Sequence, residues 1–157
     1  RTNEPIRLNQ IYYDFDDDKI LPASEPDLQF LVDIMNKYPD MKIELSSHTD
    51  AQGKDEYNEK LSQRRADSAK RWVVAKGISV DRIKAVGYGE KQILNRCING
   101  VECPDEEHRF NRRTEFKILS GPTSILIEKV EKRDPKQPKA QNPGGKQSVN
   151  PLFFYQN

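Results

Sequence analysis

Two hydrophobic periodicities alternate along this chain and restrict the folds that are open to it. A half-buried strand carries apolar side chains at every second residue, and the strand-like segments are 10–15, 41–45, 83–86 and 114–118. Apolar side chains recur every three or four residues in 24–38 and 55–76, as on one face of a helix. Right-handed crossovers place both helices on one face of a sheet. The sequence therefore predicts an α+β fold, a two-layer sandwich of order βαβαββ with a mixed four-stranded sheet.

Residues with special backbone preferences mark the ends of both predicted helices. Ser24 followed by Pro26 is typical of a helix start, because proline suits the first helical turn. Pro39 ends the same helix, since the residue before a proline is driven out of helical geometry. Gly77 is the predicted stop of the second helix. Both helices are therefore bounded by local sequence signals.

Composition divides the 157 residues into one folded domain and two flanking segments. Hydrophobic residues make up 34% and charged residues 32%, which indicates a compact core diluted by polar segments. We expect the domain at 8–119, an N-terminal extension at 1–7, and a tail rich in proline and glycine at 120–157. Residues 1–4 have no signal-peptide character, so we expect an excised part of a longer protein.

Charge and motif content argue against several classes of function. The net charge of +1 provides no overall field for nucleic acid or an anionic membrane, so no nucleic-acid partner is expected. No apolar run approaches the roughly 20 residues that span a bilayer. The sequence contains no nucleophile elbow, glycine-rich phosphate loop or metal-binding motif. We therefore expect neither catalysis nor a cofactor or metal.

Two cysteines lie close together in the long loop that precedes the last predicted strand. Cys97 and Cys103 flank a segment whose central Asn99-Gly100 is typical of a turn, so the chain can fold back on itself. We interpret the pair as a disulfide, which implies an oxidising compartment. Two free thiols in a reduced protein are the alternative. A metal site is disfavoured, because the spacing lacks paired Cys-x-x-Cys motifs.

A carboxylate at a predicted strand exit precedes a guanidinium on the following helix. Asp50 ends the run His48-Thr49-Asp50, and Arg65 lies one helical turn beyond Leu61. A guanidinium binds a carboxylate through two parallel hydrogen bonds, and an aspartate accepts hydrogen bonds from an ammonium. The pair therefore suits a ligand with both an ammonium and a carboxylate on one carbon. Spacing alone leaves open whether Asp50 and Arg65 bind each other instead.

Blocks of sequence between residues 11 and 113 resemble the OmpA-like peptidoglycan-binding domain. In chain order the matching blocks are Ile11-Tyr12-Tyr13-Asp14-Phe15-Asp16, Ser47-His48-Thr49-Asp50, Tyr57-Asn58, Leu61-Ser62, Arg65-Ala66, Gly87-Tyr88-Gly89-Glu90 and Asn111-Arg112-Arg113. They cover nearly the whole predicted domain in the order of the family. The cysteine-bearing loop is longer than the minimal domain needs, and it is similar to loops in OmpA-like domains that end envelope lipoproteins of Bacteroidota.

The resemblance implies a binding site for the diaminopimelate of the peptidoglycan stem peptide. Asp50 and Arg65 are then expected to hold the diaminopimelate headgroup. The further implied site residues are Phe15, Asp16, Thr49, Asn58, Leu61 and Arg112. For Asn58, a structural role that ties the loop to the helix stays open beside ligand contact. Of Arg112 and Arg113, one is expected to face the groove and the other solvent, and the sequence does not decide which.

The implied function is a non-catalytic tether that holds an outer-membrane-associated protein or complex to the cell wall in the periplasm. Its partner is then the stem peptide, with other envelope or secretion-machinery proteins as further partners. The alternative is a protein-interaction module with a vestigial groove, in which the tail or the cysteine loop binds a partner. Loss of wall binding in Asp50→Ala or Arg65→Ala separates these two hypotheses.

Overall fold

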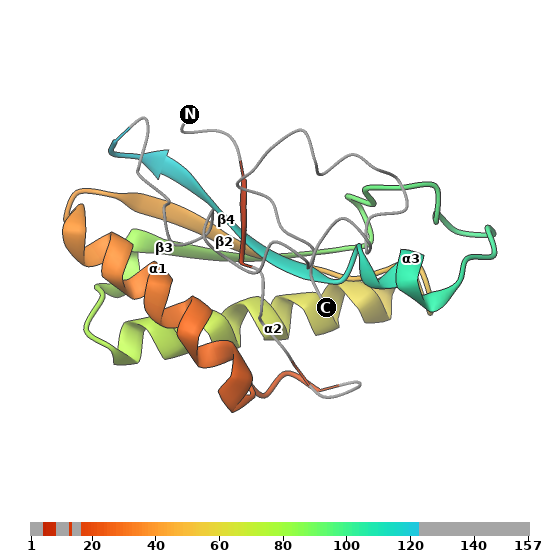
Figure 1. Ribbon diagram of the computed structural model, residues 1–157, viewed down its shortest axis with the longest axis horizontal. Helices are drawn as coiled ribbons and strands as arrows, with labels where there is room; N and C mark the ends of the chain where they lie inside the picture. Colours follow the sequence, from red (N-terminus) through yellow and green to blue (C-terminus); the bar gives the residue numbers. More distant parts are fainter. Residues whose placement is uncertain (1–4, 9–12, 14–16, 123–157) are drawn as a thin grey trace.

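The computed structural model describes residues 5–8, 13 and 17–122 and shows a layer of strands beside two long helices (Figure 1). The strands in this part of the chain are β1 (Ile6–Leu8), β2 (Lys42–His48), β3 (Ile83–Gly89) and β4 (Arg113–Ser120). The helices are α1 (Glu25–Lys37), α2 (Asp55–Ala75) and the short α3 (Asp105–Arg109), with 3-10 turns at Pro22–Ser24 and Val80–Arg82. Among these residues, no helix is both long enough and apolar enough to cross a membrane.

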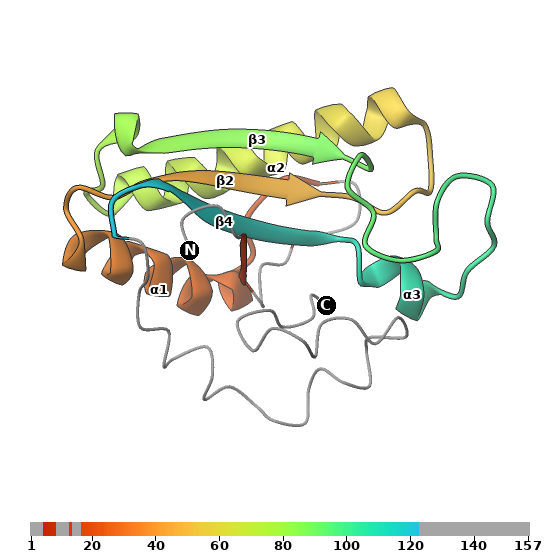
Figure 2. The same ribbon diagram turned by 90° about the horizontal axis from the view of Figure 1, so that it is seen from above.

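The four described strands form one mixed sheet in the order β1-β4-β2-β3. Strands β2 and β3 run parallel, whereas β4 runs antiparallel to both of its neighbours, β1 and β2. Figures 1 and 2 show α1 and α2 on the same face of this sheet, as the right-handed crossovers predict. The predicted α+β class and two-layer architecture are therefore confirmed.

Helix α1 begins and ends at its predicted signals, and α2 ends at its predicted stop. Ser24 precedes the first residue of α1, Pro26 lies in its first turn, and the helix ends two residues before Pro39. Helix α2 ends at Ala75, and the nearby Gly77 has a φ of 106°, a left-handed conformation that strongly favours glycine. The local sequence therefore sets the length of each helix.

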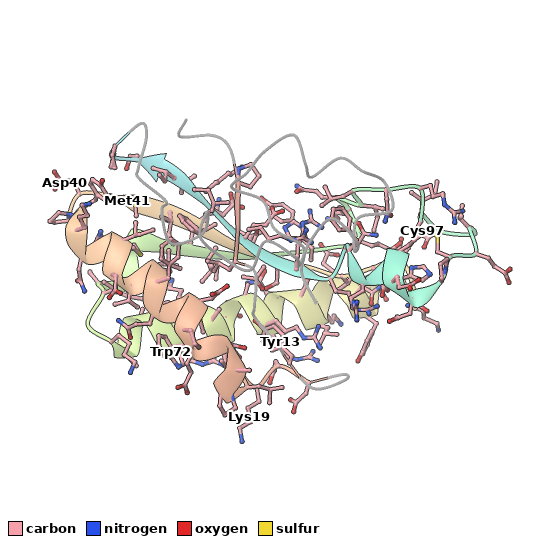
Figure 3. The ribbon with its side chains drawn as sticks, in the orientation of Figure 1. Tyr13, Lys19, Asp40, Met41, Trp72 and Cys97 are labelled. Carbon is pink, nitrogen blue, oxygen red and sulfur yellow. A yellow bond between two sulfur atoms is a disulfide. The ribbon has the colours of Figure 1, made fainter. Side chains whose placement is uncertain are left out.

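The core lies between the sheet and the two helices. Its fully buried members on α1 and α2 are Leu28, Leu31, Met35, Ala69 and Val73, and those on the sheet include Ile43, Leu45 and Phe116. Burying one such large aliphatic or aromatic side chain contributes about 1.5–3 kcal/mol. Trp72 is half-buried and packs against this cluster, as its helical phase predicts (Figure 3).

Strand β3 approaches the backbone of α2 so closely that only glycine fits at one position. A Cβ atom at Gly87 would collide with the backbone of Ser62 and Gln63. The side-chain amide of Gln63 occupies the same contact, accepting a hydrogen bond from the Gly87 N–H at 2.8 Å and donating one to the Ala85 carbonyl at 3.1 Å. This contact fixes the N-terminal half of α2 against the sheet, where the candidate site lies.

The N-terminal part of the sheet differs from the prediction. The strand expected at 10–15 falls outside the described residues, apart from Tyr13, which lies in no regular element. Instead, Ile6–Leu8 pairs antiparallel with β4, so the sheet includes residues that precede the expected domain start at residue 8. Three residues with an arginine in the middle carry too little alternation to predict a strand. The tail beyond residue 122 lies outside the described residues, and β4 ends at Ser120.

Candidate functional site

Asp50 lies in the loop that leaves β2, as predicted, and its carboxylate is held by that loop. The backbone N–H of Gln52 donates to Asp50 Oδ1 at 2.8 Å, and the Gln52 side-chain amide donates to Oδ2 at 3.0 Å. Thr49 is fixed beside it, because its N–H donates to the Gly89 carbonyl at 2.9 Å. Both Thr49 and Asp50 are buried. The carboxylate is therefore preorganised by the strand exit rather than free to rotate.

Asn58 ties this loop to the start of α2. Its side-chain amide donates to the Gln52 carbonyl and to Glu90 Oε1, each at 2.9 Å, and lies 3.4 Å from the Asp50 carbonyl. Asn58 is buried, so these hydrogen bonds replace water for the loop carbonyls. The structural role that the sequence left open for Asn58 is therefore present, and ligand contact remains a prediction.

Arg112 is the ion-pair partner of Asp50 in the described part of the chain. One nitrogen of its guanidinium contacts Asp50 Oδ2, and another lies 3.1 Å from Asp105 Oδ1. The Arg112 side chain is 31% exposed, whereas that of Asp50 is only 8% exposed. The alternative that Asp50 pairs with Arg65 is therefore not what the structure shows. Arg112 covers a buried carboxylate from the solvent side.

Arg65 projects from α2 one turn beyond Leu61 and packs on an aromatic ring. Its guanidinium carbon lies 4.6 Å from the centre of the Tyr13 ring, and its Nε donates to the Asp17 carbonyl at 2.7 Å. The Tyr13 hydroxyl donates to the Arg65 carbonyl at 3.1 Å, and burial raises the pKa of Tyr13 to about 12. Figure 3 shows Tyr13 against α2. The Tyr13 ring and the Asp17 carbonyl therefore help to fix the position of the guanidinium.

The predicted site residues that the structure describes fall into two groups, one around the end of β2 and one on α2. Around the β2 exit the structure gathers Thr49, Asp50, Asn58, and Arg112. Arg65 lies further along α2, with the buried Leu61 one turn before it. Phe15 and Asp16 lie outside the described residues.

A second polar cluster lies inside the sheet and was missed by the sequence reasoning. Arg113 Nε donates to Glu115 Oε2 at 2.6 Å, and His48 Nε2 lies 3.5 Å from Glu115 Oε1 and 3.0 Å from Ser46 Oγ. Burial, then the charge of Arg113, lowers the pKa of His48 to about 3. Burial raises the pKa of Glu115, but Arg113 and His48 hold it below its ordinary value. Arg113 is thus buried, which corrects the expectation that one arginine of the pair faces solvent.

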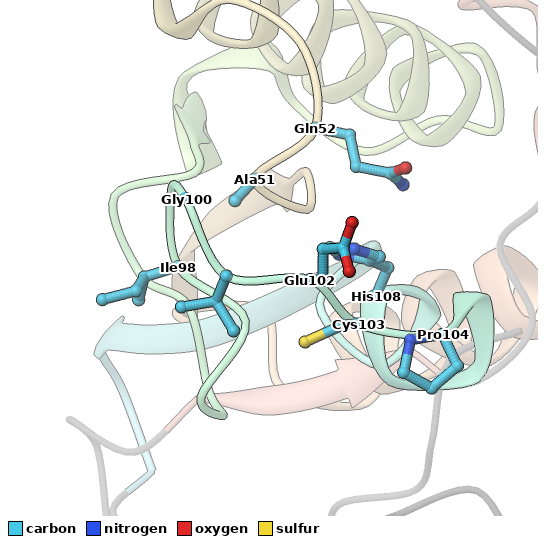
Figure 4. Close-up of a pocket in the computed structure, with 9 residues that line it drawn as sticks. Ala51, Gln52, Ile98, Gly100, Glu102, Cys103, Pro104 and His108 are labelled. Carbon is cyan, nitrogen blue, oxygen red and sulfur yellow. The ribbon is translucent and has the colours of Figure 1, made fainter.

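The cysteine loop forms one wall of a pocket beside Asp50. Cys97 and Cys103 form the predicted disulfide, with an S–S distance of 2.03 Å. The opposite wall is the β2–α2 loop, and the space between them is about 720 Å³ (Figure 4). The described residues that line it are Ala51, Gln52, Ile98, Gly100, Val101, Glu102, Cys103, Pro104 and His108. No pattern in the sequence indicated this pocket, because its two walls are brought together only by the fold.

Solved structures share this architecture of helices on one face of a mixed sheet. The peptidoglycan-associated lipoprotein from Burkholderia pseudomallei superposes with a TM-score of 0.60 at 24% identity, over 69% of this chain and 87% of that one. The cell wall anchor of the T6SS from Pseudomonas aeruginosa gives a TM-score of 0.59 at 21% identity, over 73% of this chain and 78% of that one. These likenesses define the class of fold.

The chain belongs to the OmpA family, whose model matches residues 12–103. Outer membrane porin F of Pseudomonas fluorescens is 46% identical over 108 residues, which is 69% of this chain and 32% of the porin. The peptidoglycan-associated lipoprotein of Pasteurella multocida is 35% identical over 86 residues, 55% of this chain and 57% of the lipoprotein. The chain thus spans about a third of one relative and just over half of the other.

Membership of the family bears directly on catalysis. OmpA-like domains are structural modules and not enzymes, so the prediction of a non-catalytic domain is confirmed. The relatives are envelope proteins, which agrees with an oxidising compartment that permits the Cys97–Cys103 disulfide.

Proposed function

We propose that this domain binds peptidoglycan through the diaminopimelate of the stem peptide and so tethers an outer-membrane-associated protein to the cell wall in the periplasm. The observation that carries the proposal is a buried, preorganised carboxylate, Asp50, at the strand exit of an OmpA-family domain, with Arg65 further along the adjoining helix. Relatives named as peptidoglycan-associated lipoproteins support peptidoglycan as the ligand.

The headgroup of diaminopimelate has the two charges that these side chains complement. Its ammonium binds Asp50, whose two oxygens offer about four acceptor sites in total. Its carboxylate binds the guanidinium of Arg65 through paired hydrogen bonds. Leu61, between them on α2, packs on the aliphatic chain of the ligand. Thr49 and Asn58 hold the loop in place, and Phe15 and Asp16 complete the groove by resemblance to the family.

Arg112 has to make room for the ammonium in this proposal. Its guanidinium already contacts Asp50, and its 31% exposed side chain can shift toward Asp105 while the ligand binds. A cation then replaces a cation, so the buried carboxylate is never left unpaired. Arg112 can also bind the ligand's carboxylate once it has moved.

Calorimetric titration with a diaminopimelate-containing stem peptide, and with the same peptide carrying lysine, tests the proposal. We expect binding to the diaminopimelate form alone, because lysine lacks the second carboxylate. Asp50→Ala and Arg65→Ala are each expected to weaken binding by about 2 kcal/mol or more, roughly 30-fold, because each leaves one ligand charge unpaired. Circular dichroism checks that both variants fold.

Arg64→Ala is the matched control for Arg65→Ala. Arg64 is the preceding residue on α2, and its 48% exposed side chain pairs with Asp18 at 3.2 Å. Removing it deletes one positive charge from the same helical turn, yet it should leave affinity within about twofold, since an exposed pair contributes little. Full affinity in Arg65→Ala would contradict the headgroup model.

The tether serves a larger assembly in this proposal. One structural relative is described as a cell wall anchor of the T6SS, so envelope or secretion-machinery proteins are the proposed further partners of the parent protein. Pull-down of the domain with purified peptidoglycan sacculi tests the wall-binding part directly. Retention that survives Asp50→Ala would assign the interaction to another surface.

A further inference from the structure

The pocket between the cysteine loop and the β2–α2 loop is continuous with Asp50. Gln52 lines the pocket and also donates to both oxygens of Asp50, through its backbone and its side chain. On the other wall, Pro104 is followed by Asp105, whose carboxylate binds Arg112, the ion-pair partner of Asp50. Figure 4 shows Gln52 facing Glu102 across this space. A ligand whose ammonium reaches Asp50 therefore has this space beside it.

The size and lining of the pocket are those of a binding site for a small neutral group. Its volume of about 720 Å³ lies within the usual range for ligand pockets, roughly 300–1,000 Å³. Ala51, Ile98, Val101 and Pro104 supply an apolar surface. The polar lining groups are the amide of Gln52, the carboxylate of Glu102 and the imidazole of His108. Such a mixture suits an alkyl side chain next to a peptide bond.

His108 is the imidazole among the described residues that line the pocket. The residue is buried at 7% exposure, and its Nδ1 has no hydrogen-bond partner among the described residues. A buried polar nitrogen without a partner costs stability, so its presence calls for an explanation. Nδ1 itself is shielded, so it is the rest of the ring that meets the space of the pocket.

We propose that this pocket binds the alanyl residue that follows diaminopimelate in the stem peptide, in its amide-linked form. The inference rests on the proposed function, because it assumes that the diaminopimelate headgroup occupies the site of Asp50 and Arg65. The alanine methyl packs against Ala51 and Val101, and its amide N–H donates to Glu102. The Cys97–Cys103 disulfide holds the wall that carries Val101 and Glu102.

The charges that line the pocket favour the alanyl residue over two other parts of peptidoglycan, the glutamate before diaminopimelate and the sugar. The residue before diaminopimelate is a γ-linked glutamate with a free carboxylate, which Glu102 and the neighbouring Asp105 repel. A sugar ring usually needs a broad aromatic platform, and none of the nine described lining residues is Phe, Tyr or Trp. An amide-linked alanine has neither a charge nor a ring, so of these three parts of peptidoglycan it is the one that the lining accepts.

Two synthetic peptides test the inference. One is a stem tripeptide ending in diaminopimelate with its backbone carboxyl as carboxamide, and the other extends it by D-alaninamide, so both carry the same charge. Calorimetry with the wild-type domain should show about tenfold tighter binding of the longer peptide, the effect of one buried methyl and one hydrogen bond. Val101→Trp places a bulky indole on the wall that is proposed to contact the alanine methyl, so both peptides should then bind with the affinity of the shorter one.

Matched variants separate pocket filling from general damage. Val80→Trp makes the same change at a 57% exposed valine in the turn before β3, at the opposite end of the sheet, and should keep the tenfold preference. Glu102→Gln, at an exposed position, keeps the fold and should reduce the preference about threefold by weakening one hydrogen bond.

The outcomes distinguish this inference from the proposed function. Equal binding of both peptides by the wild type, or a preference that survives Val101→Trp, overturns the pocket assignment. If the shorter peptide still binds and Asp50→Ala abolishes that binding, the proposed function stands without the pocket. If neither peptide binds the wild type, the proposed function fails and the pocket assignment fails with it.

Discussion

Arg112 and Arg113 are neighbours at the entrance to β4, yet they occupy opposite environments. The Arg113 side chain is 1% exposed and bonds to Glu115, to the Asn111 carbonyl and to the Gln92 carbonyl. Arg112 is 31% exposed and bridges Asp50 and Asp105. The first guanidinium is enclosed by fixed acceptors. The second lies between two carboxylates and is partly exposed.

The comparison shows how one residue type serves two purposes a single position apart. A buried ion pair cannot exchange partners without exposing a charge to a medium of low polarity, so the Arg113–Glu115 pair is fixed. In the Asp50–Arg112 pair only the arginine is partly exposed, so its guanidinium can move into water while an incoming ammonium takes its place beside the buried carboxylate. The Asp50–Arg112 pair can therefore open for a ligand while the Arg113 cluster holds the strands around it.

The largest expected effect comes from breaking the buried cluster. Arg113→Ala leaves Glu115 as a buried charge without its main partner, and we expect the free energy of unfolding to fall by about 3 kcal/mol or more. Urea unfolding followed by circular dichroism measures it. A loss below about 1 kcal/mol would contradict the difference proposed here, because Arg113 would then matter no more to stability than Arg112.

A smaller effect is expected from pH acting on the same cluster. The pKa of His48 is about 3 in the folded state, below its ordinary value of 6.5, because the buried ring is held neutral. The unfolded chain therefore binds the proton more readily, and stability falls as the pH drops below about 6.5. Between pH 7 and pH 5 this amounts to about 2 kcal/mol.

His48→Gln is the variant that isolates the histidine. Glutamine keeps a hydrogen-bonding group near Ser46 but does not titrate, so its stability should change little between pH 7 and pH 5. Glu115 acts in a separate window, because its lowered pKa keeps it ionised until the pH falls below about 4.5. If His48→Gln keeps the pH dependence of the wild type, a residue other than His48 is responsible for it.

The smallest effect on stability is expected from removing Arg112. Arg112→Ala should lower the free energy of unfolding by about 1–2 kcal/mol, less than Arg113→Ala, because the buried Asp50 loses its ion-pair partner but keeps two hydrogen bonds from Gln52. Asp105 is 70% exposed, so a double-mutant cycle between Arg112 and Asp105 should give a coupling energy near zero. A coupling energy above about 1 kcal/mol would show that the contact between Arg112 and Asp105 stabilises the fold, as the contacts of Arg113 do.

The sequence predicted the parts of the fold that repeat a period over many residues. Helix α1 and helix α2 were found because their apolar spacing is sustained and their ends carry Pro39 and Gly77. Strand β1 was missed, since three residues are too few to show alternation. The short helix α3 was missed for the same reason, lying in a loop with no apolar stripe.

The sequence predicted which residues lie at the candidate site where a motif follows a strand directly. It did not predict which way their side chains point, because the fold decides that. Asp50 was placed at a strand exit because the motif follows a strand directly. Its partner could not be chosen, since Arg112 and Arg113 differ only in which face of the sheet the backbone turns them toward. The His48 cluster was missed because alternating polar residues on a strand normally indicate a solvated face.

The position of β4 in the sheet has a consequence for how the domain can form. The last strand in the described part of the chain lies between β1 and β2, and Ile6 pairs with Phe116 across almost the full length of the domain. A chain supplied from its N-terminus therefore cannot complete the sheet until residues 113–120 arrive, and β1 joins it only through them. Closing so long a loop is slow, so the sheet is completed only after the last strand has been made, and the loop around Asp50 gains its final neighbours, Arg112 among them, at the end.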